Sequence, residues 1–307
     1  MLVPVYGVFV SLNMFSVLPL SRFFFISLQV KLSIVYLRMK EASKILFISQ
    51  EICPYLDETP YSLLGRKLPQ VAQENGCETR TFMPKFGEIN ERRNQLHEVI
   101  RLSGMNLIIE DTDHPLIIKV ASIQAARMQV YFIDSDDYFR RRKSVADENG
   151  VEYEDNDERC IFFARGVLET VKKLRWTPDI IHCQGWMAAL APLFVKKGYH
   201  DDPFFHDSKV VLSLLDKEYV TPFRDNFAEK VRMEEMQDSD LQDIMSKPVD
   251  YETLMKLAID YSDGVIQATP TVRDSLVTYA KEKGVEFMDY AGMDNYQAYI
   301  DFYNSLL

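Results

Sequence analysis

Side chains that could bind a ligand follow two short apolar runs of the chain. Glu51 comes just after the run KILFIS, and His182, Gln184 and Trp186 end or follow the run DIIHC. Carboxylate, imidazole and amide groups form hydrogen bonds with hydroxyl groups, and an indole ring stacks on flat apolar surfaces. These four residues are therefore the candidates for binding a polar ligand, and no residue is assigned a catalytic role.

Each candidate also has a purely structural interpretation. The Glu51 carboxylate could cap nearby backbone N–H groups. His182 ends a run that reads as a buried strand, which favours a core histidine whose hydrogen bonds are satisfied. Trp186 stands where a helix would begin, and packing is more typical there than stacking on a ligand. Both interpretations stay open for these three residues, and Gln184 stays a candidate for a hydrogen bond to a sugar.

The cysteines and histidines show no spacing typical of metal ligands. No CxxC, HxxxH or HExxH pattern occurs, so we expect no metal site and no cofactor. Scattered cysteines are typical of reduced thiols in a cytoplasmic protein. The formal net charge of -11 argues against a nucleic-acid partner but leaves a neutral ligand such as a polysaccharide open. The residues concerned are Cys53, Cys77, Cys160, Cys183, His97, His114, His182, His200 and His206.

Short β-rich runs alternate with segments of helical periodicity from Lys44 onward, which predicts a doubly wound, mostly parallel α/β sheet. Ligands of such sheets bind beyond the carboxyl ends of the strands, where the candidates lie. Segments within 98–133 read as hairpins, and the acidic stretch 144–159 reads as a solvated loop. We expect strands at 44–49, 78–83, 98–102, 106–110, 116–123, 128–133, 179–183, 209–215 and 264–268, and helices at 61–74, 157–174, 186–197, within 224–261 and from Pro270 to about Lys283.

The two ends of the chain differ from its middle. Residues 1–38 contain no Asp or Glu and are rich in Phe, Leu and Val, which we interpret as an apolar leader or a mis-called gene start. A membrane anchor is the alternative, although polar interruptions make membrane association unfavourable. Residues 39–290 form the predicted α/β domain. Residues 291–307 are predicted to form a helix whose tyrosines pack onto the sheet or, alternatively, expose a carbohydrate platform.

Five segments together resemble the bacterial glycogen synthase and plant starch synthase family, in the same order and spacing from about residue 44 to 280. They are KILFISQEICPYL, FMPKFGEINERRNQLHEV (82–99), VYFIDSDDYFRRR (130–142), TPDIIHCQGWMAALAP (177–192) and YSDGVIQATPTVRD (261–274). The resemblance implies one of the two Rossmann-like domains of a glycosyltransferase that extends α-1,4-glucans from ADP-glucose. The resemblance reaches the N-terminal, acceptor-side catalytic domain only, and the sequence printed here ends just after it.

The first loop departs from the family pattern. The family carries Lys-x-Gly-Gly-Leu there, in which glycines let backbone N–H groups approach a diphosphate and the lysine neutralises it. The aligned residues here run from Asp57 through Glu58, Thr59 and Pro60 to Tyr61. Asp57 would repel a phosphate where the family lysine attracts it, and Pro60 lacks a donor N–H.

The later loops depart as well. The family reads His-x-His-Asp-Trp-His in the second loop, whereas this chain keeps only His182 and Trp186 and places Met187 at the last histidine. Leu214 and Leu215 stand where the family tends to show His-Asn. Polar groups that could stabilise charge at the reacting carbon are therefore mostly missing.

These observations predict a synthase-like chain that is catalytically impaired by itself, a possible pseudoenzyme of glycogen biosynthesis. The alternatives are a glucan-binding, regulatory or scaffold protein of glycogen metabolism, or one half of a split synthase. The partners implied are an α-glucan such as glycogen, a full-length synthase or a second copy of the chain.

Overall fold

The computed structural model describes residues 2–5, 8–11, 42–140, 143–245 and 248–307. The chain divides into two units, Met1–Ala42 and Ser43–Leu307. In the first unit, β1 (Leu2–Val5) pairs antiparallel with β2 (Val8–Ser11). Most of the predicted leader lies outside the described residues, so that prediction and the alternative of a membrane anchor stay untested. None of the helices within the described ranges is long and apolar enough to cross a membrane.

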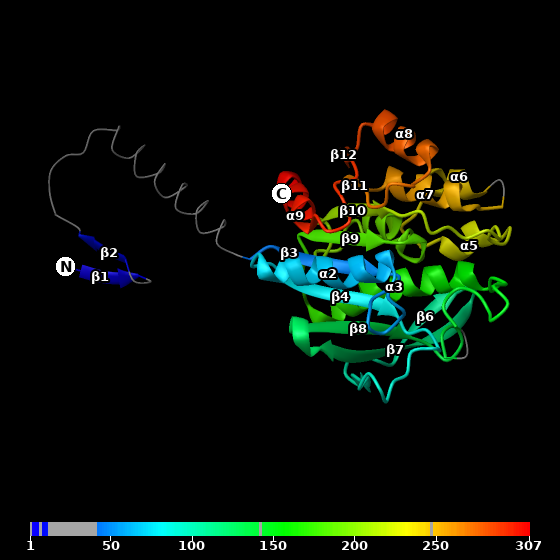
Figure 1. The fold of residues 1–307 in the computed structure, drawn as a ribbon, viewed down its shortest axis with the longest axis horizontal. Coiled ribbons are helices and arrows are strands. Elements are labelled where there is room, and N and C mark those ends of the chain that lie inside the picture. The colour runs from blue at the N-terminus through cyan, green and yellow to red at the C-terminus, as the bar shows by residue number, and fades with distance from the viewer. Residues whose placement is uncertain (1, 6–7, 12–41, 141–142, 246–247) are drawn as a thin grey trace. The chain divides into compact units, whose positions relative to one another are not determined.

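Within the described residues, the second unit is built on one sheet of ten strands (Figure 1). The strands from β12 to β8 are parallel, and β7, β5 and β6 add an antiparallel edge. In spatial order they are β12 (Glu286–Met288), β11 (Gly264–Gln267), β10 (Lys209–Leu214), β9 (Ile180–Gln184), β3 (Lys44–Ser49), β4 (Glu78–Pro84), β8 (Met128–Asp134), β7 (Thr112–Ile123) and β5 (His97–Glu98), and β6 (Met105–Ile109) pairs with β7.

Alternation along the central strands sends apolar side chains to both faces of the sheet. In β3, Ile45 and Phe47 join one buried cluster, whereas Leu46 and Ile48 join the other. The first cluster is covered by α2 (Pro60–Glu74) and α9 (Tyr296–Leu306). The second is covered by α3 (Asn156–Leu174), α4 (Ala191–Leu193), α7 (Tyr251–Asp260) and α8 (Asp274–Lys283). Helices on both faces confirm the doubly wound, mostly parallel α/β fold.

The antiparallel edge has the hairpin connections that the sequence predicts. Glu110 and Asp111 join β6 to β7, and both have positive φ angles of 50° and 58°, which suits a two-residue turn. The β7–β8 connection ends on Arg127, also left-handed with φ of 50°. The predicted strand at 98–102 is wrong in extent, because β5 contains only His97 and Glu98 and the chain turns at once.

Two predicted helices differ from the structure. The segment 186–197 is a 3₁₀ turn (Trp186–Ala188), the short α4 and a π-helical turn (Phe194–Gly198) rather than one helix. α8 begins at Asp274 instead of Pro270, because the Thr271 hydroxyl is bonded to the Asp216 carboxylate and ties this segment to the end of β10. The helices expected within 224–261 are α5 (Phe227–Val231), α6 (Asp238–Met245) and α7.

The acidic stretch 144–159 is not simply a solvated loop. The Glu152 carboxylate accepts hydrogen bonds from the backbone N–H groups of Val220 and Thr221, at 2.7 to 3.1 Å. Asp157, fully buried, pairs with Arg224 at 2.6 Å and with Lys230 at 3.6 Å. Basic partners more than 60 residues away thus hold this stretch, which composition alone cannot reveal.

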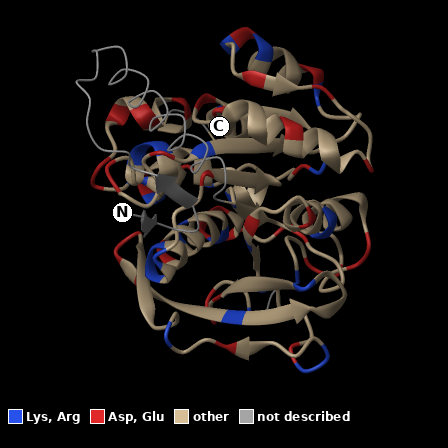
Figure 2. Ribbon diagram, turned by 90° about the vertical axis from the view of Figure 1, so that its left-hand side faces the viewer, with Lys and Arg blue, Asp and Glu red and all other residues tan. Residues whose placement is uncertain are grey.

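Charged side chains lie mainly on the helices and loops, and the strands of the large sheet carry few of them (Figure 2). This distribution fits a sheet whose two faces are both buried. Functional charges are therefore to be sought in the loops beyond the strand ends.

Candidate functional site

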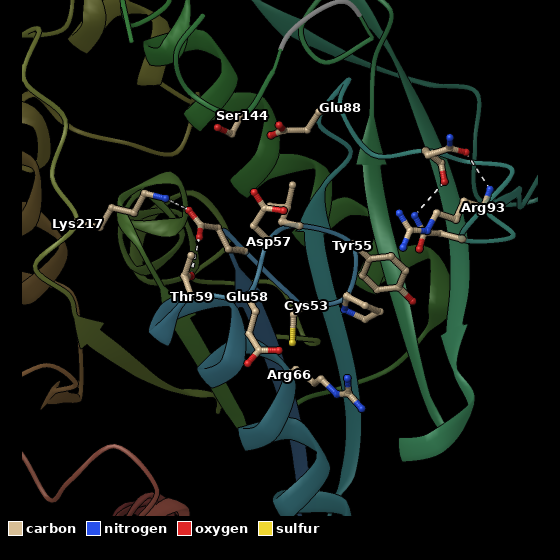
Figure 3. Close-up of a pocket in the computed structure, with 15 residues that line it drawn as sticks. Cys53, Tyr55, Asp57, Glu58, Thr59, Arg66, Glu88, Arg93, Ser144 and Lys217 are labelled. Atoms are coloured by element: carbon tan, nitrogen blue, oxygen red, sulfur yellow. Dashed lines mark hydrogen bonds and ion pairs between the residues drawn. The ribbon is translucent and has the colours of Figure 1, made fainter. Parts of the chain in front are cut away.

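A cleft opens beyond the carboxyl end of β3, where the strand order reverses between β3 and β9 (Figure 3). Such a reversal is where doubly wound sheets bind ligands. The cleft has a volume of about 570 Å³ and a mostly charged and polar lining. It is lined by Glu51, Cys53, Pro54, Tyr55, Leu56, Asp57, Glu58, Thr59, Arg66, Glu88, Asn90, Arg93, Asn94, Ser144 and Lys217.

The N-terminus of α2 at this cleft is capped by its own residues. The Thr59 hydroxyl accepts a hydrogen bond from the Ser62 N–H at 3.0 Å, and the Ser62 hydroxyl accepts one from the Thr59 N–H at 2.9 Å. The Leu63 N–H donates to the Thr59 carbonyl at 2.9 Å, and Pro60 has no N–H to offer. This reciprocal capping box uses donors that a free helix N-terminus would present to an anion.

Glu51 lies at the base of the cleft with a side chain only 7% exposed. Its carboxylate forms an ion pair with Lys217 and accepts a hydrogen bond from the Thr59 hydroxyl at 3.4 Å, as the dashed lines in Figure 3 mark. Gly65 of α2 packs against the Glu51 carbonyl, and a Cβ at that position would collide with it. Glu51 therefore interacts with side chains rather than only capping the backbone.

His182 lies in the core below the cleft rather than in it. Its Nε2 atom is 2.7 Å from the Ser213 hydroxyl and its Nδ1 atom is 2.5 Å from the Tyr303 hydroxyl. Burial lowers the pKa of His182 to about 3, so the ring is neutral at physiological pH. This geometry matches the interpretation of a core histidine with satisfied hydrogen bonds.

The other candidates of the second loop are buried too. The Gln184 amide donates to the Tyr61 carbonyl at 2.8 Å and ties β9 to α2. Trp186 is 1% exposed, with ring centroids 5.0 Å from Tyr219 and 6.0 Å from Phe223. Met187 is fully buried. The surroundings of Trp186 thus agree with the packing interpretation. A ligand role for Gln184 and Trp186 stays a prediction.

The structure brings together in the cleft only part of the predicted set. Glu51, Asp57 and Thr59 line it, with Asp57 exposed, while Pro60 begins α2 just beside it. Leu214 and Leu215, at the third loop, are buried at the end of β10. A single loop therefore contributes all the predicted residues that a ligand in the cleft could reach.

The C-terminal tyrosines pack inward. Tyr299 and Tyr303 of α9 are buried, and Tyr303 contacts His182 through its hydroxyl group. α9 therefore covers the sheet beside α2 (Figure 1). Of the two interpretations of this segment, packing describes these two residues.

Comparison with known proteins assigns the chain to a sequence family. The sequence profile of the starch synthase catalytic domain matches residues 44–288. The chain belongs to the starch synthase catalytic domain family. It is 38% identical over 184 residues to a glycogen synthase of Chlorobium limicola, covering 59% of this chain and 38% of that protein. It is 31% identical over 252 residues to a glycogen synthase of Chlorobaculum parvum, covering 82% of this chain and 49% of that protein.

A solved structure supports the same fold. The catalytic domain of starch synthase IV from Arabidopsis thaliana, bound to ADP and acarbose, superposes with a TM-score of 0.64 at 16% identity. The match covers 81% of this chain and 51% of that one. The chain thus spans about half or less of the length of these relatives.

Lys217 lines this cleft although the sequence analysis does not name it. Lys217 follows the buried strand β10 and reaches Glu51 across 166 positions of the chain. The signal was present, because Asp216, Lys217 and Glu218 are three charges directly beyond a buried strand. Within the described residues, no group of three or more His, Cys, Asp or Glu side chains could hold a metal ion.

Proposed function

We propose that this chain binds an α-1,4-glucan in the cleft beside the β3 loop and does not by itself transfer glucose from ADP-glucose. The observation that carries the proposal is the α2 N-terminus, where Asp57 and Glu58 stand exposed before a helix whose cap is filled by Thr59 and Ser62. A neutral sugar needs hydrogen-bonding groups and no cation, and this cleft supplies carboxylates, amides and hydroxyls.

The electrostatics of the cleft oppose a diphosphate. Four carboxylates line it, from Glu51, Asp57, Glu58 and Glu88, and they outnumber the three cationic groups, from Arg66, Arg93 and Lys217. Anions bind helix N-termini because free N–H groups and the helix dipole attract them. Here the Ser62 N–H is already used within the chain, and the family lysine is replaced by Asp57. A nucleotide diphosphate would meet like charges and fewer donors.

The segment from β9 into its loop places no charged or polar group where it could stabilise the charges that develop during glucosyl transfer. Glycosyl transfer builds positive charge at the sugar carbon and negative charge on the leaving diphosphate, and preorganised polar groups stabilise such charges. His182 is buried and neutral, and Met187 is a buried thioether. Neither side chain is among the residues that line the cleft, which supports the proposal.

Glucosyl transfer is the second candidate function, because the chain belongs to a family of synthase catalytic domains and is 31–38% identical to glycogen synthases. A split synthase, in which another polypeptide binds the donor, is one form of this candidate. A regulatory or scaffold role on glycogen is compatible with the first candidate, since it requires glucan binding alone.

Incorporation of labelled glucose separates the two candidates. The purified chain, free of host synthase, is incubated with labelled ADP-glucose and glycogen, with an active glycogen synthase as the positive control. We expect no incorporation above a blank without protein. Time-dependent incorporation by the chain alone would establish the second candidate, and incorporation only after adding another protein would establish the split form.

A further inference from the structure

One ion pair lies at the base of the cleft. Among the described residues that line it, Lys217 is the one lysine, and its ammonium group contacts the Glu51 carboxylate. We propose that Glu51 sets the charge preference of the cleft: by pairing with Lys217 it removes a cation that would hold a phosphate, and so keeps the cleft selective for uncharged sugars. This inference deepens the proposed function and rests on it for the place of the ligand.

Lys217 has the access that a ligand needs. Its side chain is 34% exposed, whereas that of Glu51 is 7% exposed. Its ammonium group also lies 5.7 Å from the centre of the Tyr61 ring, in the range of a cation–π contact. The lysine side chain is therefore partly open to solvent at the cleft, and the more deeply buried Glu51 carboxylate neutralises its charge.

The backbone on both sides of Lys217 is fixed by other contacts. Asp216 accepts a hydrogen bond from the Tyr61 hydroxyl at 2.7 Å and another from Thr271. Glu218 accepts a hydrogen bond from the Arg273 Nε atom at 2.5 Å. Because these contacts do not involve Glu51, Lys217 should keep its place when the charge of Glu51 is removed.

The pair lies beside the N-terminus of α2. The Thr59 hydroxyl that caps α2 donates to Glu51, so Lys217 stands beside the positive end of this 15-residue helix. In Figure 3, Arg93 lies on the other side of Asp57 from Lys217, and Arg66 lies lower in the view, below Glu58 and Cys53. A freed Lys217 would thus be the cation next to the helix N-terminus, in the role that the family lysine plays from the β3 loop.

The test is titration of four proteins with inorganic pyrophosphate at low ionic strength, by calorimetry. Glu51→Gln keeps the size of the side chain and one acceptor oxygen while removing its charge. We expect it to bind pyrophosphate at least about tenfold more tightly than the unmodified chain, since a charge-assisted hydrogen bond is gained. Glu58→Gln, which removes a cleft charge that neutralises no lysine, should gain less. The double variant E51Q/K217Q should return to the unmodified affinity.

The gain should also weaken as salt is added, because it is electrostatic. An E51Q protein that is folded by circular dichroism and binds pyrophosphate no better than the unmodified chain overturns the inference. So does a double variant that keeps the gain. If E51Q does not fold, Glu51→Ala frees the same lysine and is held to the same two outcomes.

Failure of this inference and failure of the proposed function are distinguishable. The proposed function fails if the unmodified chain does not bind maltooligosaccharides, whatever the result of the pyrophosphate titrations. The inference fails on the pyrophosphate titrations alone, even when maltooligosaccharides bind the unmodified chain.

Discussion

The loops after β3 and β9 begin side by side, since Ser49 and Gln184 are paired in parallel register. The two loops nevertheless differ in their exposure to solvent. The β3 loop lines an open cleft, with Asp57 and Glu58 exposed. The β9 loop is buried, and Trp186 and Met187 form part of the core. The first loop presents carboxylates to the cleft, whereas the second packs in the core.

This difference predicts opposite consequences of mutation. Buried side chains contribute to stability through the apolar contacts that they make, whereas exposed charges near a cleft change stability little and binding more. Substitutions after β9 should therefore destabilise the protein, and substitutions after β3 should change what it binds.

The largest effect is expected for Trp186→Ala. Removing a buried indole that packs on Tyr219 and Phe223 should lower the free energy of unfolding by about 3–5 kcal/mol. Chemical denaturation measures this, with Trp186→Phe as the control that keeps most of the packing. A loss below about 1 kcal/mol would mean that the indole is not part of the core.

A smaller effect should appear as a pH dependence of stability through His182. Its pKa is lowered to about 3 in the folded chain, while the unfolded chain has an ordinary value near 6.5. The contribution is fully present above pH 6.5 and is lost as the pH falls, by up to about 1.4 kcal/mol per unit, because only the unfolded chain binds the proton.

The measurement compares the unmodified chain with His182→Gln from pH 7 to pH 5, by chemical denaturation. The stability difference between them should shrink steadily as the pH falls. A difference that stays constant over this range would show that His182 titrates normally in the folded chain.

The smallest effect concerns the cap of α2. Thr59→Ala removes the hydroxyl that accepts the Ser62 N–H and should lower the free energy of unfolding by about 1 kcal/mol. Thr59→Ser keeps the hydroxyl and should lose much less. Equal losses in the two variants would mean that the methyl group of Thr59, and not its hydroxyl, stabilises this turn.

Much of the difference between the loops after β3 and β9 could be predicted from the sequence, because hydrophobic periodicity and residue type are local properties of the chain. The β3 and β9 runs, the helix from residue 61 and the substitutions in both loops all follow from short stretches of residues. The core interpretation of His182 followed from its place at the end of a buried strand, and its two hydroxyl partners agree with it.

The rest could not be predicted because it depends on contacts between distant segments. The pairing of Lys217 with Glu51 requires that β10 and β3 end at the same edge of the sheet with β9 between them. The delayed start of α8 depends on the bond between Thr271 and Asp216. The burial of Asp157 depends on Arg224 and Lys230. No local pattern contains this information.

On this proposal, the cleft accepts a glucan and rejects an anionic donor. The most direct measurement is calorimetric titration of the unmodified chain with maltoheptaose and, separately, with ADP-glucose under identical conditions. We predict saturable binding of maltoheptaose and no saturation with ADP-glucose over the same concentration range. Tighter binding of ADP-glucose than of maltoheptaose would contradict this proposal and would favour glucosyl transfer as the function of the chain.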